Sequence, residues 1–326
     1  MALQPLFNPS NDMALAANVR QYFPPSRIRQ MESDLASLSR LWPEGPWGWS
    51  LATKQRYLAL GVGREELPSD EWLHEVRRLS SRQFGVAYYQ AMDGLMAGDE
   101  AGSALLPCRA RYCSTMGELA AALEACPVSI IKAPWSSSGR GNMVVGRSDE
   151  DCDSASQRGR LSQTERQRAE GLIRQQGGLV VEPFYAEKAL DFAMEFEVAD
   201  GAARFLGYSV FSADEMGHYC GNLVESQESL LRHIALPASL LQQLADYHCR
   251  QLSTLSYRGP VGIDMMRLRD GRIHPCVEIN FRMTMGLLAL RLQQIGTSAD
   301  QLLAGNERQG FAARIVGRRL VIEYNK

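Results

Sequence analysis

Asp264, Glu278, Asn280 and Arg282 lie within one short segment, GPVGIDMMRLRDGRIHPCVEINFR at residues 259–282. Side chains alternate along a strand, so Glu278, Asn280 and Arg282 would share one face. A tight turn at the DG dipeptide would bring Asp264 alongside them. Two carboxylates about 4 Å apart repel by roughly 4 kcal/mol at an effective dielectric constant of about 20, unless a cation or a proton separates them. Magnesium prefers oxygen ligands, so the segment predicts a metal site at Asp264, Glu278 and Asn280.

The alternative for this segment is a surface hairpin with an ion pair between Arg282 and Glu278. The EIN triplet, however, lies inside an otherwise apolar strand. Unpaired acids are disfavoured in such a position, so the sequence favours the metal site over the surface hairpin.

A lysine followed by a small-residue loop occurs at residues 130–146, IIKAPWSSSGRGNMVVG. Lys132 ends an apolar strand and a second strand follows the loop, which indicates a hairpin; both the P-loop and the dinucleotide motif place these residues differently. Small residues let backbone N–H groups approach phosphate oxygens, while hydroxyls and an ammonium add donors. A plain surface hairpin is the alternative. The phosphate hypothesis assigns contacts to Lys132, Ser136, Ser137, Ser138, Gly139, Arg140 and Gly141.

An apolar strand ends on an acid and a proline at residues 180–185, VVEPFY. Exposed main chain there can bond the edge of a purine, apolar side chains can enclose its faces, and a nearby carboxylate can accept from ribose hydroxyls. The alternative for the acid is a solvated strand end. The purine hypothesis assigns contacts to Glu182, Pro183, Phe184, Tyr185 and Asp191.

Three units can be distinguished along the chain, with boundaries at 1–105, 106–181 and 182–326. The first is predicted to be a small α/β unit, with strands at 3–7 and 56–60 and helices at 13–23, 31–42 and 69–97. The second has strands around helices 116–125 and 163–176. The third has several strands, two helices (239–255 and 287–303) and one terminal strand at 314–324. This pattern predicts a mixed α/β (α+β) fold.

Composition is typical of an ordinary globular enzyme: 326 residues, formal charge −2, 45% hydrophobic and 22% charged residues. The near-neutral charge gives no indication of nucleic-acid binding. No signal-like segment or apolar run of membrane-spanning length occurs, so a cytoplasmic protein without membrane association is expected. Seven cysteines without a CxxC pair indicate neither a zinc site nor a disulfide framework.

The three segments, in this order, resemble the ATP-grasp superfamily of carboxylate–amine and carboxylate–thiol ligases, over roughly residues 105–290. The resemblance implies two α+β subdomains enclosing ATP, preceded by a smaller α/β domain. It implies that Lys132 contacts the phosphates, that Glu278 bridges two Mg²⁺ ions, and that Arg282 faces the transferring phosphate. Lys132 and Arg282 would thus be the catalytic side chains.

The resemblance is incomplete at two places. Family members usually carry a further phosphate-binding basic residue ahead of the glycine loop, and no lysine stands there in this sequence. Arg82 is the best substitute, although four other arginines compete with it: Arg77, Arg78, Arg109 and Arg111. The ribose carboxylate could be Glu187 instead of Asp191.

The function expected from these features is an ATP- and Mg²⁺-dependent ligase that activates a carboxylate as an acyl phosphate for attack by an amine or thiol. Its partners would be small-molecule or peptide substrates, and self-association into a homodimer is left open. The turn NPSND and the residues Tyr219 and Asn222 are further candidates for substrate contacts. The alternatives are a small-molecule kinase on the same fold and a nucleotide-binding sensor without catalysis.

Overall fold

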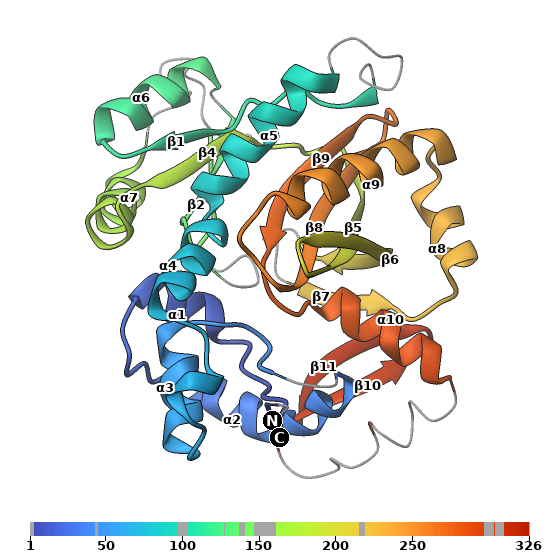
Figure 1. Cartoon of the computed structure of the whole chain (residues 1–326). Helices are drawn as coiled ribbons and strands as arrows, with labels where there is room; N and C mark the ends of the chain where they lie inside the picture. Colours follow the sequence, from blue (N-terminus) through green and yellow to red (C-terminus); the bar gives the residue numbers. More distant parts are fainter. Residues whose placement is uncertain are drawn as a thin grey trace.

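The computed structural model describes residues 3–42, 45–96, 104–126, 128–136, 141–146, 161–214, 219–296, 303 and 310–325. Helices surround two separate antiparallel sheets (Figure 1). This mixed architecture confirms the α/β class expected from the sequence. In the described part of the chain, no helix is both long and apolar enough to cross a membrane.

The N-terminal region is helical. Its elements are α1 (Asn11–Ala17), α2 (Ser26–Asp34), a 3₁₀ helix (Ala36–Leu41), α3 (Leu51–Ala59), a 3₁₀ turn (Arg64–Glu66), α4 (Asp70–Leu79) and α5 (Arg82–Met96).

Both strands expected in this region are wrong. The segment at 3–7 makes only an isolated bridge between Leu6 and Pro46. The run at 56–60 belongs to α3, because Ser50 caps that helix by accepting from the Thr53 N–H, and the buried residues recur at helical rather than alternating spacing. The helix expected at 69–97 is two helices, α4 and α5.

The first sheet has four strands in the order β1-β4-β2-β3. Its strands are β1 (Arg111–Cys113), β2 (Ser129–Lys132), β3 (Met143–Val145) and β4 (Leu179–Pro183). Helices α6 (Met116–Ala125) and α7 (Gln163–Gln176) contribute to its apolar core. Both begin at a capping box, Thr115 with Glu118 and Ser162 with Glu165, which explains why their predicted bounds are confirmed.

The second sheet has seven strands in the order β10-β11-β7-β6-β5-β8-β9. They are β5 (Lys188–Ala199), β6 (Ala202–Ala213), β7 (Tyr219–Leu223), β8 (Gly259–Leu268), β9 (Ile273–Asn280), β10 (Gly310–Val316) and β11 (Arg319–Asn325). The single terminal strand expected at 314–324 is a hairpin instead, since Gly317 adopts a φ of 63° between β10 and β11.

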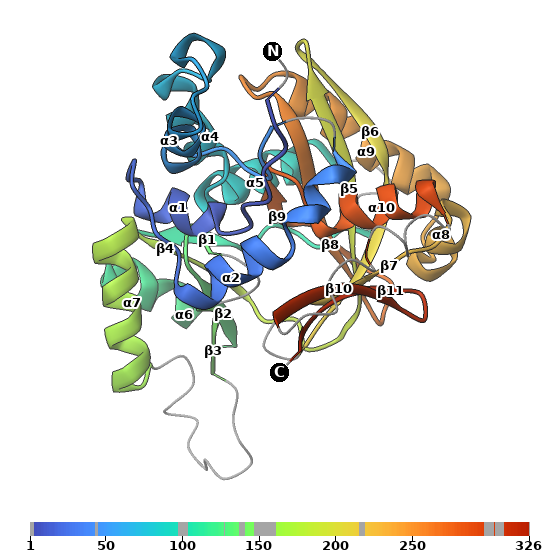
Figure 2. The same cartoon turned by 90° about the horizontal axis from the view of Figure 1, so that it is seen from below.

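The two faces of this second sheet differ in polarity. Phe192, Met194 and Ile263 point to an apolar core that also contains residues of α8 (Gln227–Ile234) and α9 (Ala238–Ser253). Helix α10 (Met285–Ile295) also packs on this sheet and belongs to a different core, shared with the N-terminal region. Helix α2 lies beside the β10–β11 hairpin (Figure 2), where Asp34 accepts from the Phe311 N–H at 2.9 Å.

Cross-strand register gathers polar residues on one face of the sheet. Asp264 pairs with Glu278 across β8 and β9, and one row along, Gly262 pairs with Asn280. On the other side of β8, Gly262 pairs with Glu195 of β5. The side chains of these two rows project toward the N-terminal region. This face therefore carries a group of acids and an amide that could bind a ligand.

Candidate functional site

The predicted metal ligands are neighbours in the structure. Asp264 and Glu278 are cross-strand partners, and the Asn280 Nδ2 donates to Asp264 Oδ2 at 3.1 Å. Burial raises the pKa of Asp264 well above its ordinary range, and the nearby charges of Glu278 and Glu195 raise it further. The three side chains therefore form an oxygen-rich group in which like charges oppose each other.

Arg282 is bound to an acid of the N-terminal region. Its Nε donates to Asp12 Oδ1 at 2.9 Å, and its Nη2 donates to Asn280 Oδ1 at 2.8 Å. The alternative ion pair between Arg282 and Glu278 is not the one seen. Asp12 belongs to the NPSND turn, so that turn presents a negative charge beside Arg282, which disfavours its binding a substrate carboxylate.

Lys132 and Glu182 form a buried ion pair between neighbouring strands of the first sheet. Their side chains are only 9% and 7% exposed. Burying two charges is costly unless each compensates the other, and removing one partner leaves the other uncompensated. Glu182 thus faces the lysine rather than ending the strand in solvent.

Arg82 connects the two sheets. Its Nη1 donates to the Ala133 carbonyl and to Ser136 Oγ, each at 2.7 Å. Its Nη2 donates to Glu278 Oε1 at 2.7 Å. A single guanidinium at the start of α5 therefore joins the strand exit after Lys132 to the acidic pair on β8 and β9.

The arginines that compete with Arg82 for a role in the site include two that are engaged elsewhere. Arg77 donates to the Leu15 carbonyl and stacks on Trp135, with 3.8 Å from its Cζ to the ring centroid. Arg78 forms an exposed ion pair with Glu75. Of these three arginines, only Arg82 reaches the acidic group.

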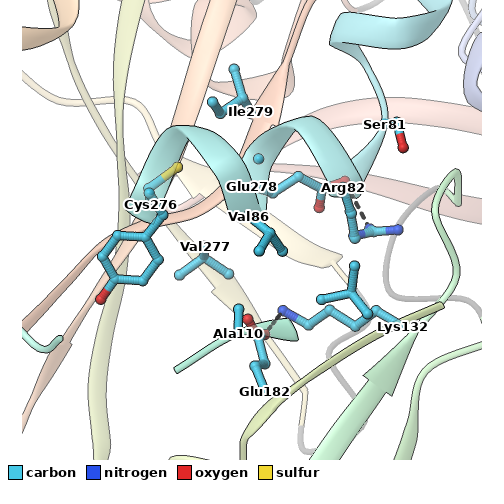
Figure 3. A pocket seen from close by; sticks show the side chains of 13 residues that line it. Ser81, Arg82, Val86, Ala110, Lys132, Glu182, Cys276, Val277, Glu278 and Ile279 are labelled. Atoms are coloured by element: carbon cyan, nitrogen blue, oxygen red, sulfur yellow. Dashed lines mark hydrogen bonds and ion pairs between the residues drawn. The ribbon is translucent and has the colours of Figure 1, made fainter. Parts of the chain in front are cut away.

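A small cavity of about 20 Å³ lies where these side chains meet. Figure 3 shows Lys132 reaching Glu182 and Arg82 reaching toward Glu278, with Val86 of α5 between them. The cavity has room for about one water molecule, so any larger anion must displace one carboxylate from each cation.

His274 on β9 also belongs to this neighbourhood. Its Nε2 lies 3.9 Å from Glu182 Oε2, and its ring centroid is 5.8 Å from that of Tyr185. Burial lowers the pKa of His274 to about 4. The sequence could have indicated this position, because His274 lies four residues before Glu278 on one strand and such residues share a face.

The other residues predicted to contact the purine, the ribose or the phosphates lie farther from the acidic group or outside the described residues. Asp191 accepts from Lys188 at 2.6 Å and is largely buried, which raises its pKa, whereas Glu187 lies at the surface, 3.7 Å from Arg269. Pro183 and Phe184 do not line this small cavity. Gly141 is exposed with a φ of 86°. Four predicted loop contacts lie outside the described residues: Ser137, Ser138, Gly139 and Arg140.

The sequence reasoning missed Glu195, which is 1% exposed on β5. Thr284 Oγ1 and Ser209 Oγ each donate to its carboxylate at 2.9 Å. Burial raises its pKa to about 7, which the two hydroxyls and the charge of Arg282 only partly offset. The sequence could have indicated Glu195, because it lies inside the apolar run FAMEF. A buried carboxylate needs hydrogen-bond donors or a cation to offset its lost hydration.

No protein-family model matches the sequence, and no curated protein does. Among solved structures, biotin carboxylase from Campylobacter jejuni in complex with β,γ-ATP is similar at 15% identity and a TM-score of 0.48, over 85% of this chain and 56% of that one. N5-carboxyaminoimidazole synthetase from Staphylococcus aureus complexed with ADP is similar at 11% identity and a TM-score of 0.41, over 64% and 46%.

The biotin carboxylase domain of 2-oxoglutarate carboxylase from Hydrogenobacter thermophilus, in complex with MgADP and bicarbonate, gives 12% identity and a TM-score of 0.45, over 68% and 46%. The chain thus spans about half the length of these solved structures. The similarity is distant.

Proposed function

We propose that the protein is an ATP- and Mg²⁺-dependent ligase that joins a carboxylate to an amine through an acyl phosphate. The contacts of Arg82 carry this proposal. One guanidinium contacts both Ser136, one of the predicted phosphate-loop residues, and Glu278, one of the predicted metal ligands. Residues that are 142 positions apart in the chain therefore serve one location, as a nucleotide bound between two sheets requires.

Charge supports a phosphate ligand there. Lys132, Arg82 and Arg282 are three cations around the acidic face, and each is held by a carboxylate. A triphosphate would exchange those carboxylates for phosphate oxygens and keep every cation compensated. In the absence of nucleotide, the carboxylates of Glu182 and Glu278 thus occupy the positions at Lys132 and Arg82 that phosphate oxygens would take.

The acidic group fits a magnesium ion. No set of three or more His, Cys, Asp or Glu side chains within the described residues is arranged for a metal on its own. Asp264, Glu278 and Asn280 offer two carboxylates and an amide, which matches the habit of Mg²⁺ of binding one or two carboxylates together with phosphate oxygens and water. When bound, the metal would offset the negative charge of the transferring phosphate.

In the proposed reaction the substrate carboxylate oxygen bonds to the γ-phosphorus and the bond to the ADP oxygen breaks. The amine nitrogen then bonds to the acyl carbon, inorganic phosphate leaves, and the amine gives up a proton. Lys132 and Arg82 would hold the phosphates, and Arg282, positioned by Asp12, would face the transferred group. Since no protein nucleophile is needed, the scattered histidines and cysteines need no catalytic role.

The experiment that tests this proposal measures binding of Mg²⁺–ATP and release of ADP and phosphate with pooled carboxylates and amines. We expect Glu278→Ala to lower ADP release about 100-fold or more, as with loss of other preorganised charges in active sites. Glu75→Ala removes an acid that only pairs with Arg78 at the surface, and it should have no effect. Absence of Mg²⁺–ATP binding to the wild type, or equal ADP release by Glu278→Ala, would refute the proposal. A phosphorylated product without free phosphate would indicate a kinase.

A further inference from the structure

A second and much larger cavity, about 510 Å³, lies on the polar face of the seven-stranded sheet. The N-terminal region forms one wall of it and strands β5 to β9 form the floor. Apolar side chains from both sides line it: Phe7, Met13, Trp47, Phe211 and Ile322. The volume suits a small organic molecule with an apolar body.

Glu195 lies in the floor of this cavity, and the neighbouring residues fix the position of its carboxylate. Ser209 and Thr284 each donate a hydroxyl to it at 2.9 Å. A Cβ at Gly262 would come within 2.8 Å of Glu195 Oε2, and a Cβ at Gly286 would overlap Oε1. Two glycines therefore leave the space that the carboxylate occupies, which makes its place specific.

The charges around the cavity favour a cationic ligand. Its lining contains three acids, Glu195, Asp264 and Glu278, and one cation, Arg282, which Asp12 and Asn280 already engage. Glu278 has Arg82 as its counter-ion. Within the described part of the chain, Glu195 has hydroxyl partners but no cationic one. A ligand carboxylate would be repelled at this position, whereas an ammonium group would be attracted to it.

We propose that this cavity binds the amine substrate, with its ammonium group at Glu195 and its apolar body against Trp47 and Phe211. This assignment of the amine as a substrate rests on the proposed function. The register supports it, because Glu195 and Asn280 lie on the same face in one cross-strand row with Gly262 between them. An amine held at Glu195 would share its cavity with Asp264 and Glu278, where the acyl phosphate would form.

Amine binding can be measured without any nucleotide. Three probes share a phenyl body and differ in the head group: 2-phenylethylamine, 2-phenylethanol and 3-phenylpropanoate. Calorimetric titration of the full chain should show the amine as the tightest binder and the carboxylate as the weakest. Glu195→Gln keeps the shape and removes the charge, so it should weaken amine binding about tenfold and leave alcohol binding unchanged.

The matched control is Glu197→Gln, the same change two residues along β5 at a side chain that does not line the cavity; it should leave the affinities of all three probes unchanged. Phe211→Ala should weaken the amine and the alcohol together. The proposal is overturned if the wild type binds the alcohol or the carboxylate as tightly as the amine, or if Glu195→Gln weakens amine and alcohol equally. The wild-type ranking decides the matter even if Glu195→Gln does not fold. Because no ATP is present, failure here leaves the ADP-release test untouched.

Discussion

The cavity beside Lys132 and the cavity beside Glu195 differ in how their charges are compensated. In the first, Lys132 pairs with Glu182 and Arg82 pairs with Glu278, and the cavity has a volume of only about 20 Å³. In the second, the hydrogen-bond partners of the buried Glu195 carboxylate in the described part of the chain are two hydroxyls, and the cavity has a volume of about 510 Å³. A site with paired charges can exchange partners with an anion, whereas a site whose acid has no ion-pair partner attracts a cation.

The largest expected effect comes from removing one partner of the buried ion pair between Lys132 and Glu182. Lys132→Met leaves Glu182 buried without its counter-ion and should reduce the free energy of unfolding by about 3–5 kcal/mol, as loss of one partner of a buried pair does. Urea denaturation measures this. The double variant Lys132→Met with Glu182→Gln should recover part of the loss. Equal stability of the single variant and the wild type would show that Lys132 and Glu182 do not form a buried ion pair.

A smaller effect is expected where space is reserved for Glu195. Gly286→Ala places a methyl group against the Glu195 carboxylate and should destabilise the protein by about 1–3 kcal/mol. The matched control is Gly171→Ala in α7, where a Cβ meets nothing within 4 Å. That control should stabilise the protein by roughly 0.5–1 kcal/mol through helix propensity. Equal effects of the two variants would contradict a shaped position for Glu195.

The unpaired side of the comparison predicts a pH dependence. The pKa of Glu195 is about 7 in the folded protein, above the ordinary value of 4.5, so the folded state binds more protons between these values. The stability from this group is complete below about pH 4.5 and is lost as pH rises through about 7, at up to about 1.4 kcal/mol per pH unit. Subtracting the unfolding free energies of Glu195→Gln from those of the wild type isolates this slope, and a flat difference would argue against an uncompensated carboxylate.

The smallest effect is expected at an exposed ion pair, which serves as a comparison for the buried pair of Lys132 and Glu182. Arg232 and Glu228 form an ion pair on α8 with side chains 65% and 85% exposed. Arg232→Met should change the unfolding free energy by less than about 0.5 kcal/mol, because solvent screens such pairs. A loss comparable to that of Lys132→Met would show that burial is not the reason for the larger effect. The same denaturation measurement serves both variants.

Sequence reasoning succeeded where local chemistry decides the structure. The capping boxes at Thr115 and Ser162 set the starts of α6 and α7, and the alternation along a strand placed Glu278 and Asn280 on one face. It failed at residues 56–60, where apolar content suggested a strand but the Ser50 cap and helical burial spacing gave α3. Propensity alone does not separate a short helix from a short strand.

The sequence by itself determined the residue types and their local spacing: a lysine before a small-residue loop, and acids on neighbouring strands. Only the tertiary structure decided which charges meet, because pairing across distant segments depends on sheet order and burial. The tertiary structure brought Arg82, and not Arg77 or Arg78, to Glu278, and it paired Asp12 with Arg282. It also placed the hydroxyls of Ser209 and Thr284 against the buried Glu195 carboxylate. Local patterns carry no information about such contacts, since desolvation and Coulomb energies depend on distances in space and not along the chain.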